Sequence, residues 1–203
     1  PAQADALFSG TIVYKGRTIT FQDAPGFEDR NWGRDFPEWW AWIVSNHFEE
    51  HTDTVLAIGG GRPVVLDTIT NFQGLGIGLR LDGREYAFRP SHGDLERVTV
   101  NFGTWEVEAI NRSGYRIVVH AAAPCESFMD LVFTTPGGEQ FHDFETLTGQ
   151  VDVELYERAG GHGQAWRLID TLHSDVAGIE YGQRDLDSFD CFDSDSKTLY
   201  SNF

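Results

Sequence analysis

The sequence has 203 residues, enough for one domain with a well-packed core, and its 40% hydrophobic and 13% aromatic content is typical of an ordered globular protein. Its 32 acidic residues outnumber 15 basic ones, for a formal net charge of −17, which argues against nucleic acid or an anionic membrane as a partner because such binding depends on clustered Lys and Arg. No segment approaches the roughly 18 apolar residues of a membrane helix, and the N-terminus lacks the basic flank and apolar core of a signal peptide, so we expect a soluble chain without stable membrane insertion.

Short segments of alternating polarity, separated by glycine-containing turns, follow one another along the chain and predict many strands with almost no helix. Residues 11–21 form a candidate hairpin that turns near a Lys-Gly pair. In residues 74–88, Asp82 and Gly83 can supply the two positive-φ positions of a type I′ turn. Further strands are expected at residues 98–102, 104–110, 115–123, 127–135, 149–158 and 166–173. Without helices to cover a sheet, the apolar faces must pack on other strands, which predicts an all-β, antiparallel barrel or sandwich.

No low-complexity linker divides the chain, so a single domain is predicted over residues 1–182. Residues 183–203 alternate acids with Phe, Cys, Leu and Tyr, and are expected to form an acidic, aromatic C-terminal tail or edge strand. Cys125 and Cys191 lie far apart and match no metal-binding spacing. Two reduced thiols are favoured over one bridge that ties the tail to the body.

Residues 39–48 are rich in tryptophan, and as a strand their side chains would alternate between two faces. One face would carry Trp40, Trp42, Val44, Asn46 and Phe48. The other would carry Trp39, Ala41, Ile43, Ser45 and His47. The first face is the better candidate for the interior, where it would either interlock as core, the favoured reading, or line a cavity for one apolar ligand. Asn46 shifts the balance slightly toward a cavity, because a buried amide needs partners and often marks a polar group in an apolar site.

Two carboxylates, Glu145 and Glu180, are embedded among apolar residues. Burial raises the pKa of a carboxylic acid, which can then stay protonated and serve as a general acid near neutral pH. The alternative is that any given carboxylate among 32 is a solvated surface charge.

Metal and phosphate sites have little support in the sequence. His47 and His51 are four positions apart but lack the Glu that follows the first His in zinc-protease motifs, so surface or structural histidines are favoured and no metal is expected. The glycine clusters at residues 59–62 and 74–78 do not have the spacing of a nucleotide-binding loop, and neither precedes a predicted helix.

Residues 21–48, FQDAPGFEDRNWGRDFPEWWAWIVSNHF, resemble the signature of the tocopherol cyclase family. In that signature an acidic-Ala-Pro segment leads to a Glu-x-x-Asn-Trp-Gly turn, then Phe-Pro and a Trp-rich strand ending in Asn-x-Phe. The matching residues are Ala24, Pro25, Glu28, Asn31, Trp32, Gly33, Phe36, Pro37, Trp40, Trp42, Asn46 and Phe48. Similar matches occur at GTWEVEAIN (residues 103–111), TLTGQVDVELYER (residues 146–158) and SDVAGIEYG (residues 174–182). The sequence departs from the family at Val44, where the family often has Gln, and has Glu145 near the family's Asp.

This resemblance implies a lipocalin-like β-barrel, related to that of carotenoid hydratases and fungal pericyclases. Longer family members have two barrel-like halves, and this chain is similar to the second, so a homodimer or a partner chain that supplies another half is expected. The implied activity is cyclisation of a prenylated hydroquinone to a chromanol without a cofactor. The implied location is the cytoplasm or an organelle stroma, with membranes as a peripheral source of substrate.

The chemistry of that reaction assigns candidate roles to residues. Glu180 or Glu145 would be the acid that protonates the alkene, and Asn46 would position the substrate by hydrogen bonding. The wall that stabilises the cation would be formed by Trp32, Trp40, Trp42 and Trp105, with Phe48 and Asn31 also in contact with substrate. Two other functions stay open: a non-catalytic carrier of isoprenoids or other apolar molecules, and a hydratase or other cyclase that acts on terpenoids.

Overall fold

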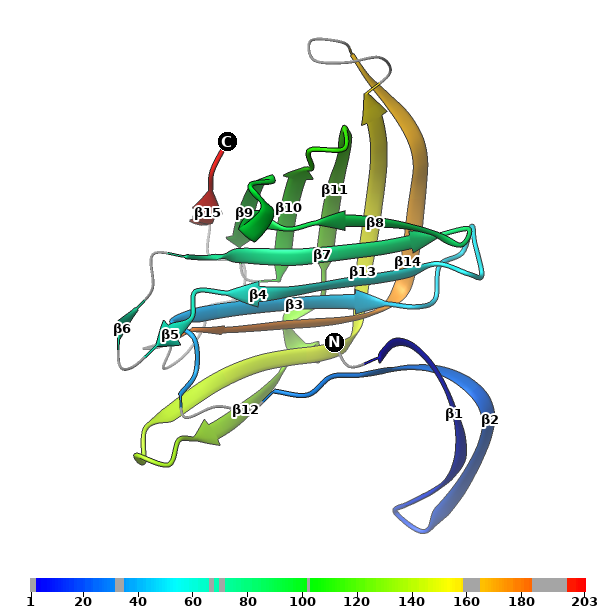
Figure 1. Ribbon diagram of the computed structural model, residues 1–203. Coiled ribbons are helices and arrows are strands. Elements are labelled where there is room, and N and C mark those ends of the chain that lie inside the picture. The colour runs from blue at the N-terminus through cyan, green and yellow to red at the C-terminus, as the bar shows by residue number, and fades with distance from the viewer. Residues whose placement is uncertain are drawn as a thin grey trace.

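The computed structural model describes residues 3–31, 35–65, 68–69, 72–101, 103–158, 165–183 and 197–203 (Figure 1). These residues form strands joined by turns and two short 3-10 helices, η1 (Pro90–His92) and η2 (Cys125–Ser127). The predicted all-β fold is therefore confirmed. None of the described helices is long and apolar enough to cross a membrane.

Fifteen strands are present in the described part of the chain. Their bounds are β1 (Gln3–Tyr14), β2 (Arg17–Glu28), β3 (Trp39–Ser45), β4 (Val55–Gly61), β5 (Val64–Val65), β6 (Thr68–Ile69), β7 (Gly74–Leu81), β8 (Arg84–Phe88), β9 (Leu95–Asn101), β10 (Thr104–Ile110), β11 (Tyr115–Ala122), β12 (Met129–Thr134), β13 (Gln140–Arg158), β14 (Trp166–Gln183) and β15 (Lys197–Ser201). Both predicted hairpin turns are confirmed, because positive φ angles occur at the Lys15–Gly16 and Asp82–Gly83 pairs.

One large antiparallel sheet has the order β15-β9-β10-β11-β13-β14-β3-β4-β7-β8, with β12 also paired to β13. The sheet curls into a half-barrel because β13 and β14 are long and bend, so that β9, β10 and β11 cross the direction of β3, β4 and β7 (Figure 1). Register shifts near Gly149 mark the bend. A Cβ at Gly149 would lie 2.4 Å from Cδ1 of Ile179, so the two long strands can approach here only because the side chain is absent.

The inner face of the curled sheet holds the hydrophobic core. β3 contributes its Trp39 face to this core, whereas the sequence favoured the Trp40 face for the interior. Trp39, Ala41 and Ile43 are buried in the core, whereas Trp40 and Trp42 point to the opposite side of the sheet. The expected alternation is therefore present. The favoured reading of the Trp40 face as core is wrong, whereas the alternative reading as a cavity wall holds for Trp40 and Trp42. Both faces of β3 are apolar, and the partner strands decide which one meets the core: β4 and β7 place Ile and Leu on the side of Trp39 and mostly Gly and Ala on the side of Trp40.

The β1–β2 hairpin forms its own two-stranded sheet and extends away from the half-barrel (Figure 1). At the other end of the chain, β15 pairs with β9 at the edge of the large sheet. Cys125 is bonded in a disulfide, so the preference for two reduced thiols is wrong for this residue. Cys191 and Trp32 lie outside the described residues.

Candidate active site

Three adjacent strands bring carboxyl and indole side chains together on the face opposite the core. Across β13, β14 and β3, Glu145 pairs with Glu180, and Glu180 pairs with Trp42. One row further, Asp143 and Trp40 lie on either side of Gly182. Directly opposed residues point to the same side of a sheet. The register therefore gathers residues that are separated by about a hundred positions in the sequence.

The indole of Trp40 holds the carboxylate of Glu180. Its Nε1 donates a hydrogen bond to Oε1 of Glu180 at 2.6 Å. Two glycines make room for this arrangement: a Cβ at Gly182 would lie 1.9 Å from Cζ2 of Trp40, and one at Gly178 would lie 2.6 Å from Cζ3 of Trp42. The pattern Gly-x-Glu-x-Gly on β14 thus allows two indole rings to lie over the strand on either side of the acid.

Asp143 lies in an environment that favours its protonated form. Burial raises its pKa to about 8, and the charges of Glu180 and Glu145 act in the same direction. Burial also raises the pKa of Glu180, which the hydrogen bond from Trp40 opposes. Asp143 and Glu180 are hydrogen-bonded to each other. Burial and like charge therefore favour a proton held by the pair, and the mutual hydrogen bond favours Asp143 as its donor and Glu180 as the acceptor.

Aromatic rings surround the two indoles. The ring of Phe27, on β2, meets Trp42 edge-on at a centroid distance of 5.1 Å. Phe36 lies 5.5 Å from Trp40 and 5.0 Å from Phe141. The electron-rich faces of such rings attract positive charge, so this part of the site can stabilise a cation.

The acids and indoles line a cavity of about 1750 Å³. Its wall also includes residues from the start of β1, the end of β2, the segment after β2 and strand β12. Its floor is formed by β4, β7 and β8, where the lining residues include several glycines and alanines. The cavity combines an acidic, aromatic end with a long apolar surface, which suits a ligand that has one reactive end and an extended apolar part.

The predicted site residues fall into three groups. Five line the cavity: Asn31, Trp40, Trp42, Glu145 and Glu180. Three lie elsewhere in the described structure: Asn46, Phe48 and Trp105. Trp32 lies outside the described residues.

Each of the three residues outside the cavity has a structural environment that accounts for its position. The strand ends at Ser45, so Asn46 follows a bend and its Nδ2 donates to the carbonyl oxygen of Gly26 at 2.9 Å. Asn46 therefore fastens β2 to the main sheet. Phe48 is buried in the core, as is Trp105, whose ring lies 5.7 Å from Phe128.

Sequence reasoning singled out Glu145 and missed Asp143. Both lie on β13 two positions apart, so the period of a strand already places them on one face. That spacing was the available signal. The sequence could not show that Asp143 is the more deeply buried of the two, since this depends on the strands that pack around it.

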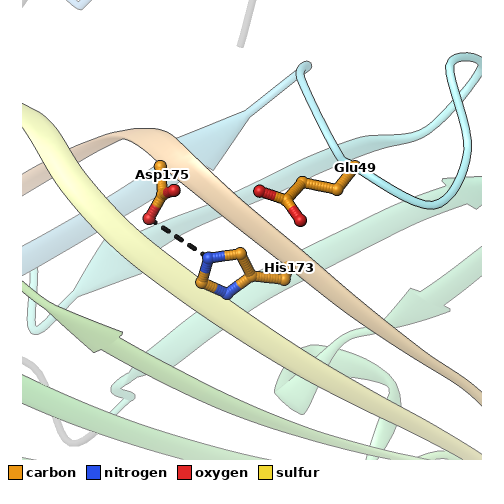
Figure 2. A group of neighbouring side chains, drawn as sticks. All are labelled: Glu49, His173 and Asp175. Carbon is orange, nitrogen blue, oxygen red and sulfur yellow. Dashed lines mark hydrogen bonds and ion pairs between the residues drawn. The ribbon is translucent and has the colours of Figure 1, made fainter.

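A second cluster of ionisable groups lies outside the cavity. Glu49, His173 and Asp175 place one potential metal ligand each within 4.8 Å of one another (Figure 2). However, Nδ1 of His173 is 2.6 Å from Oδ1 of Asp152, and Nε2 is 3.1 Å from Oδ1 of Asp175. The hydrogen bond to Asp152 raises the pKa of His173. Both ring nitrogens of His173 thus already lie at hydrogen-bonding distance from carboxylate oxygens, so this group is better explained as a hydrogen-bonded surface cluster than as a metal site.

Comparison with known proteins agrees with the sequence signature. Residues 2–183 match the family described as tocopherol cyclase-like. The chain is 25% identical over 181 residues to a probable chloroplastic tocopherol cyclase of Oryza sativa subsp. japonica, covering 88% of this chain and 38% of that protein. It is 28% identical over 182 residues to the chloroplastic tocopherol cyclase of Zea mays, again with 88% and 38% coverage.

The chain thus spans about two fifths of the length of these two relatives. Comparison with solved structures gives no significant match. The family match, in contrast, extends over nearly the whole chain, including all the cavity-lining acids and indoles. The chain belongs to the tocopherol cyclase-like family.

Proposed function

We propose that this protein is an acid-catalysed cyclase of prenylated hydroquinones or closely related isoprenoids. The observation that carries the proposal is the buried Asp143–Glu180 pair, which lies against the indole of Trp40 in a large, partly apolar cavity and whose burial raises the pKa of both acids. The names of the rice and maize relatives supply the reaction class. Cyclisation of this kind is an isomerisation, so its atom balance requires neither an oxidant nor a reductant.

In the proposed reaction, Asp143 transfers its proton to the less substituted carbon of a trisubstituted alkene. The tertiary cation that results lies near the ring faces of Trp40 and Trp42, which stabilise it electrostatically. The phenol oxygen of the same substrate then bonds to the cationic carbon and loses its proton. That proton returns to the carboxylate pair, so Asp143 and Glu180 end the cycle with the proton they held at the start.

The cavity contributes by positioning as well as by proton transfer. A substrate held with its oxygen near the alkene reacts internally before water can capture the cation. Glu180 acts by accepting the hydrogen bond of Asp143, and Trp40 fixes Glu180 through its Nε1. Glu145, on the same face, adds negative charge that keeps the proton on Asp143.

The proposal is tested by replacing each acid with its amide. General acid catalysis contributes about 10²- to 10⁴-fold, so Asp143→Asn should lower kcat for conversion of a prenylated hydroquinone to its chromanol by at least about a hundredfold. Glu180→Gln should also lower kcat, because the proton on Asp143 loses its acceptor. Product formation is measured by chromatography with mass detection, and ligand binding by quenching of tryptophan fluorescence.

Asp175→Asn is the matched control, since Asp175 is an exposed carboxylate outside the cavity. The control should convert substrate at the wild-type rate, and all variants should still bind it. If wild-type protein binds prenylated hydroquinones and converts none, the cyclase proposal is wrong and a carrier function takes its place. If Asp143→Asn retains full activity, the assignment of the acid is wrong.

A further inference from the structure

The cavity floor has a feature that acid catalysis does not explain. On its surface lies a strip without large side chains, formed by Ala57 and Gly59 of β4, Gly76 and Gly78 of β7, and Ala87 of β8. We call these five residues the small-residue strip. Register places them side by side, with Gly59 opposite Gly76, and Gly78 between Ala57 and Ala87.

Apart from Gly60, the same strands carry bulky residues on their other face. Leu56 and Ile58 alternate with the strip on β4, as do Leu75, Ile77 and Leu79 on β7, and all are buried in the core. A strand with one buried face normally carries polar side chains on the other, whereas Gly76, Gly78 and Ala87 are small and exposed. At the five positions of the strip, the cavity face of the sheet therefore lacks large side chains.

Neither backbone conformation nor crowding requires glycine at the centre of the strip. Gly59, Gly76 and Gly78 have no positive φ angle. A Cβ at Gly76 would lie 3.7 Å from its nearest neighbour, the carbonyl oxygen of Gly59, and one at Gly78 would lie 3.9 Å from that of Ala57. Both are ordinary contacts. Glycine within a strand weakens it, and commonly marks a place where a ligand or another backbone comes close.

The strip continues from the acidic end of the cavity. Gly59 is paired with Trp42, which is paired with Glu180 on the next strand. Neighbouring strands are about 4.8 Å apart, so the path from β14 across β3, β4 and β7 to β8 is roughly 19 Å long. This path crosses the strands rather than following one of them. It leads away from the carboxyl pair over the indole of Trp42, and then over paired sheet backbone and the methyl groups of Ala57 and Ala87.

We infer that the small-residue strip is the subsite for the extended apolar tail of the ligand, an unbranched or isoprenoid hydrocarbon chain, while its reactive end lies at Asp143 and Glu180. The placement of the reactive end rests on the proposed function. Because the sheet carries no large side chains here, a hydrocarbon chain can lie directly on the backbone. One side of the hydrocarbon chain is then largely removed from water. Side chains of ordinary size at these positions would fill the space that the tail occupies.

The experiment measures binding of geraniol, farnesol and geranylgeraniol by isothermal titration calorimetry. These alcohols form a series of increasing chain length and have no phenol, so their binding does not depend on cyclisation. Wild-type affinity should rise along the series. Gly76→Val and Gly78→Val should each weaken binding of geranylgeraniol by roughly tenfold or more, because each would displace about two methylene groups of the tail, at about fourfold in affinity per group.

Geraniol, the short alcohol, should bind these variants as it binds wild-type protein. Thr171→Val is the matched control, because it places the same side chain at an exposed position of β14 outside the cavity. Ala87→Val gives a third test on a separate strand. The subsite is supported if wild-type affinity rises with chain length and this rise is lost in the strip variants but kept in Thr171→Val. This result supports the subsite even if the protein converts no hydroquinone.

Two outcomes would overturn the inference. The first is wild-type affinity that does not change with chain length, which would mean that the hydrocarbon tail does not lie along the strip. The second is geranylgeraniol binding that is the same in wild-type protein and all three strip variants, which would place the tail elsewhere. Failure of the cyclase proposal is detected separately, by the absence of product from prenylated hydroquinones.

Discussion

Two buried acids in this protein share a raised pKa but differ in what surrounds them. Burial raises the pKa of Glu96 to about 8, as it does that of Asp143. Both carboxyl oxygens of Glu96 accept the backbone N–H of Leu75, at 3.1 and 3.0 Å, and Glu96 does not line the cavity. Asp143 lines the cavity beside a second acid and an indole. A raised pKa therefore identifies a candidate acid only where a ligand can reach the group.

The raised pKa of Asp143 has a consequence for stability. Its unfolded pKa is about 4 and its folded pKa about 8, so between these values the folded state binds more protons than the unfolded state. The contribution of Asp143 to the free energy of unfolding then decreases as pH rises from about 4 to about 8. Asp143→Asn removes the titration, so the variant should lose less stability than wild-type protein over this range, as measured by urea denaturation at a series of pH values.

Glu180 and Glu96 also have raised pKa values and remain in the variant, so its stability should still fall, with a smaller slope. A variant whose pH dependence coincides with that of wild-type protein would show that Asp143 is ionised when folded. Such a result would remove the physical basis for its role as the acid, whatever the catalytic activity of the variant.

At the level of single elements, β14 shows how glycine spacing shapes the site. A Cβ at Gly182 would overlap the indole of Trp40, which is nearly buried and holds Glu180 through its Nε1. Overpacking of this kind costs about 1–3 kcal/mol. Gly182→Ala should therefore destabilise the protein by that amount in urea denaturation, and should displace the indole from the carboxylate.

Gly76→Ala is the matched control for this change, because a Cβ there would meet its nearest atom at an ordinary 3.7 Å. Alanine is the better strand residue by roughly 0.5–1 kcal/mol, so the control should be as stable as wild-type protein or more so. Equal stability of Gly182→Ala and Gly76→Ala would contradict the packing of Trp40 described here.

The elements that could be predicted from sequence are those fixed by local rules. Turn dipeptides located the Lys15–Gly16 and Asp82–Gly83 hairpins, and alternation located β10, β11 and the second half of β13. The interior face of β3 could not be chosen in this way, because both of its faces are apolar and the neighbouring strands determine which one is buried. Asn46 fell outside the cavity because the strand ends one residue earlier.

Part of the candidate site could be predicted from the sequence. The family signature pointed to Trp40, Trp42 and Glu180, which the structure places on adjacent strands around one cavity. Asp143 could have been found from its spacing to Glu145, but its burial depends on β12, β14 and β3 together. The glycine clusters of β4 and β7 were correctly separated from phosphate loops, yet their place in the cavity floor required the register between the two strands.

For the whole molecule, the dominant property is its charge. The formal net charge of the chain is −17, and its excess negative charges repel one another. Folding brings these charges closer together, so the repulsion opposes the folded state. Salt reduces the Debye length from about 30 Å at 0.01 M to about 3 Å at 1 M. The unfolding temperature should therefore rise between low and molar potassium chloride, as measured by circular dichroism. An unchanged or lower unfolding temperature would show that favourable ion pairs outweigh the repulsion.

The proposed complex divides recognition of the ligand into two unequal parts. Glu180, Asp143 and Trp40 would recognise the reactive end, through protons and hydrogen bonds at fixed positions. Exposed backbone has no projecting groups that could distinguish one methyl branch or double bond from another. The protein would therefore discriminate strongly between substrates with different reactive ends. It would discriminate weakly between tails that differ in saturation or branching, and its affinity would depend mainly on the length of the tail.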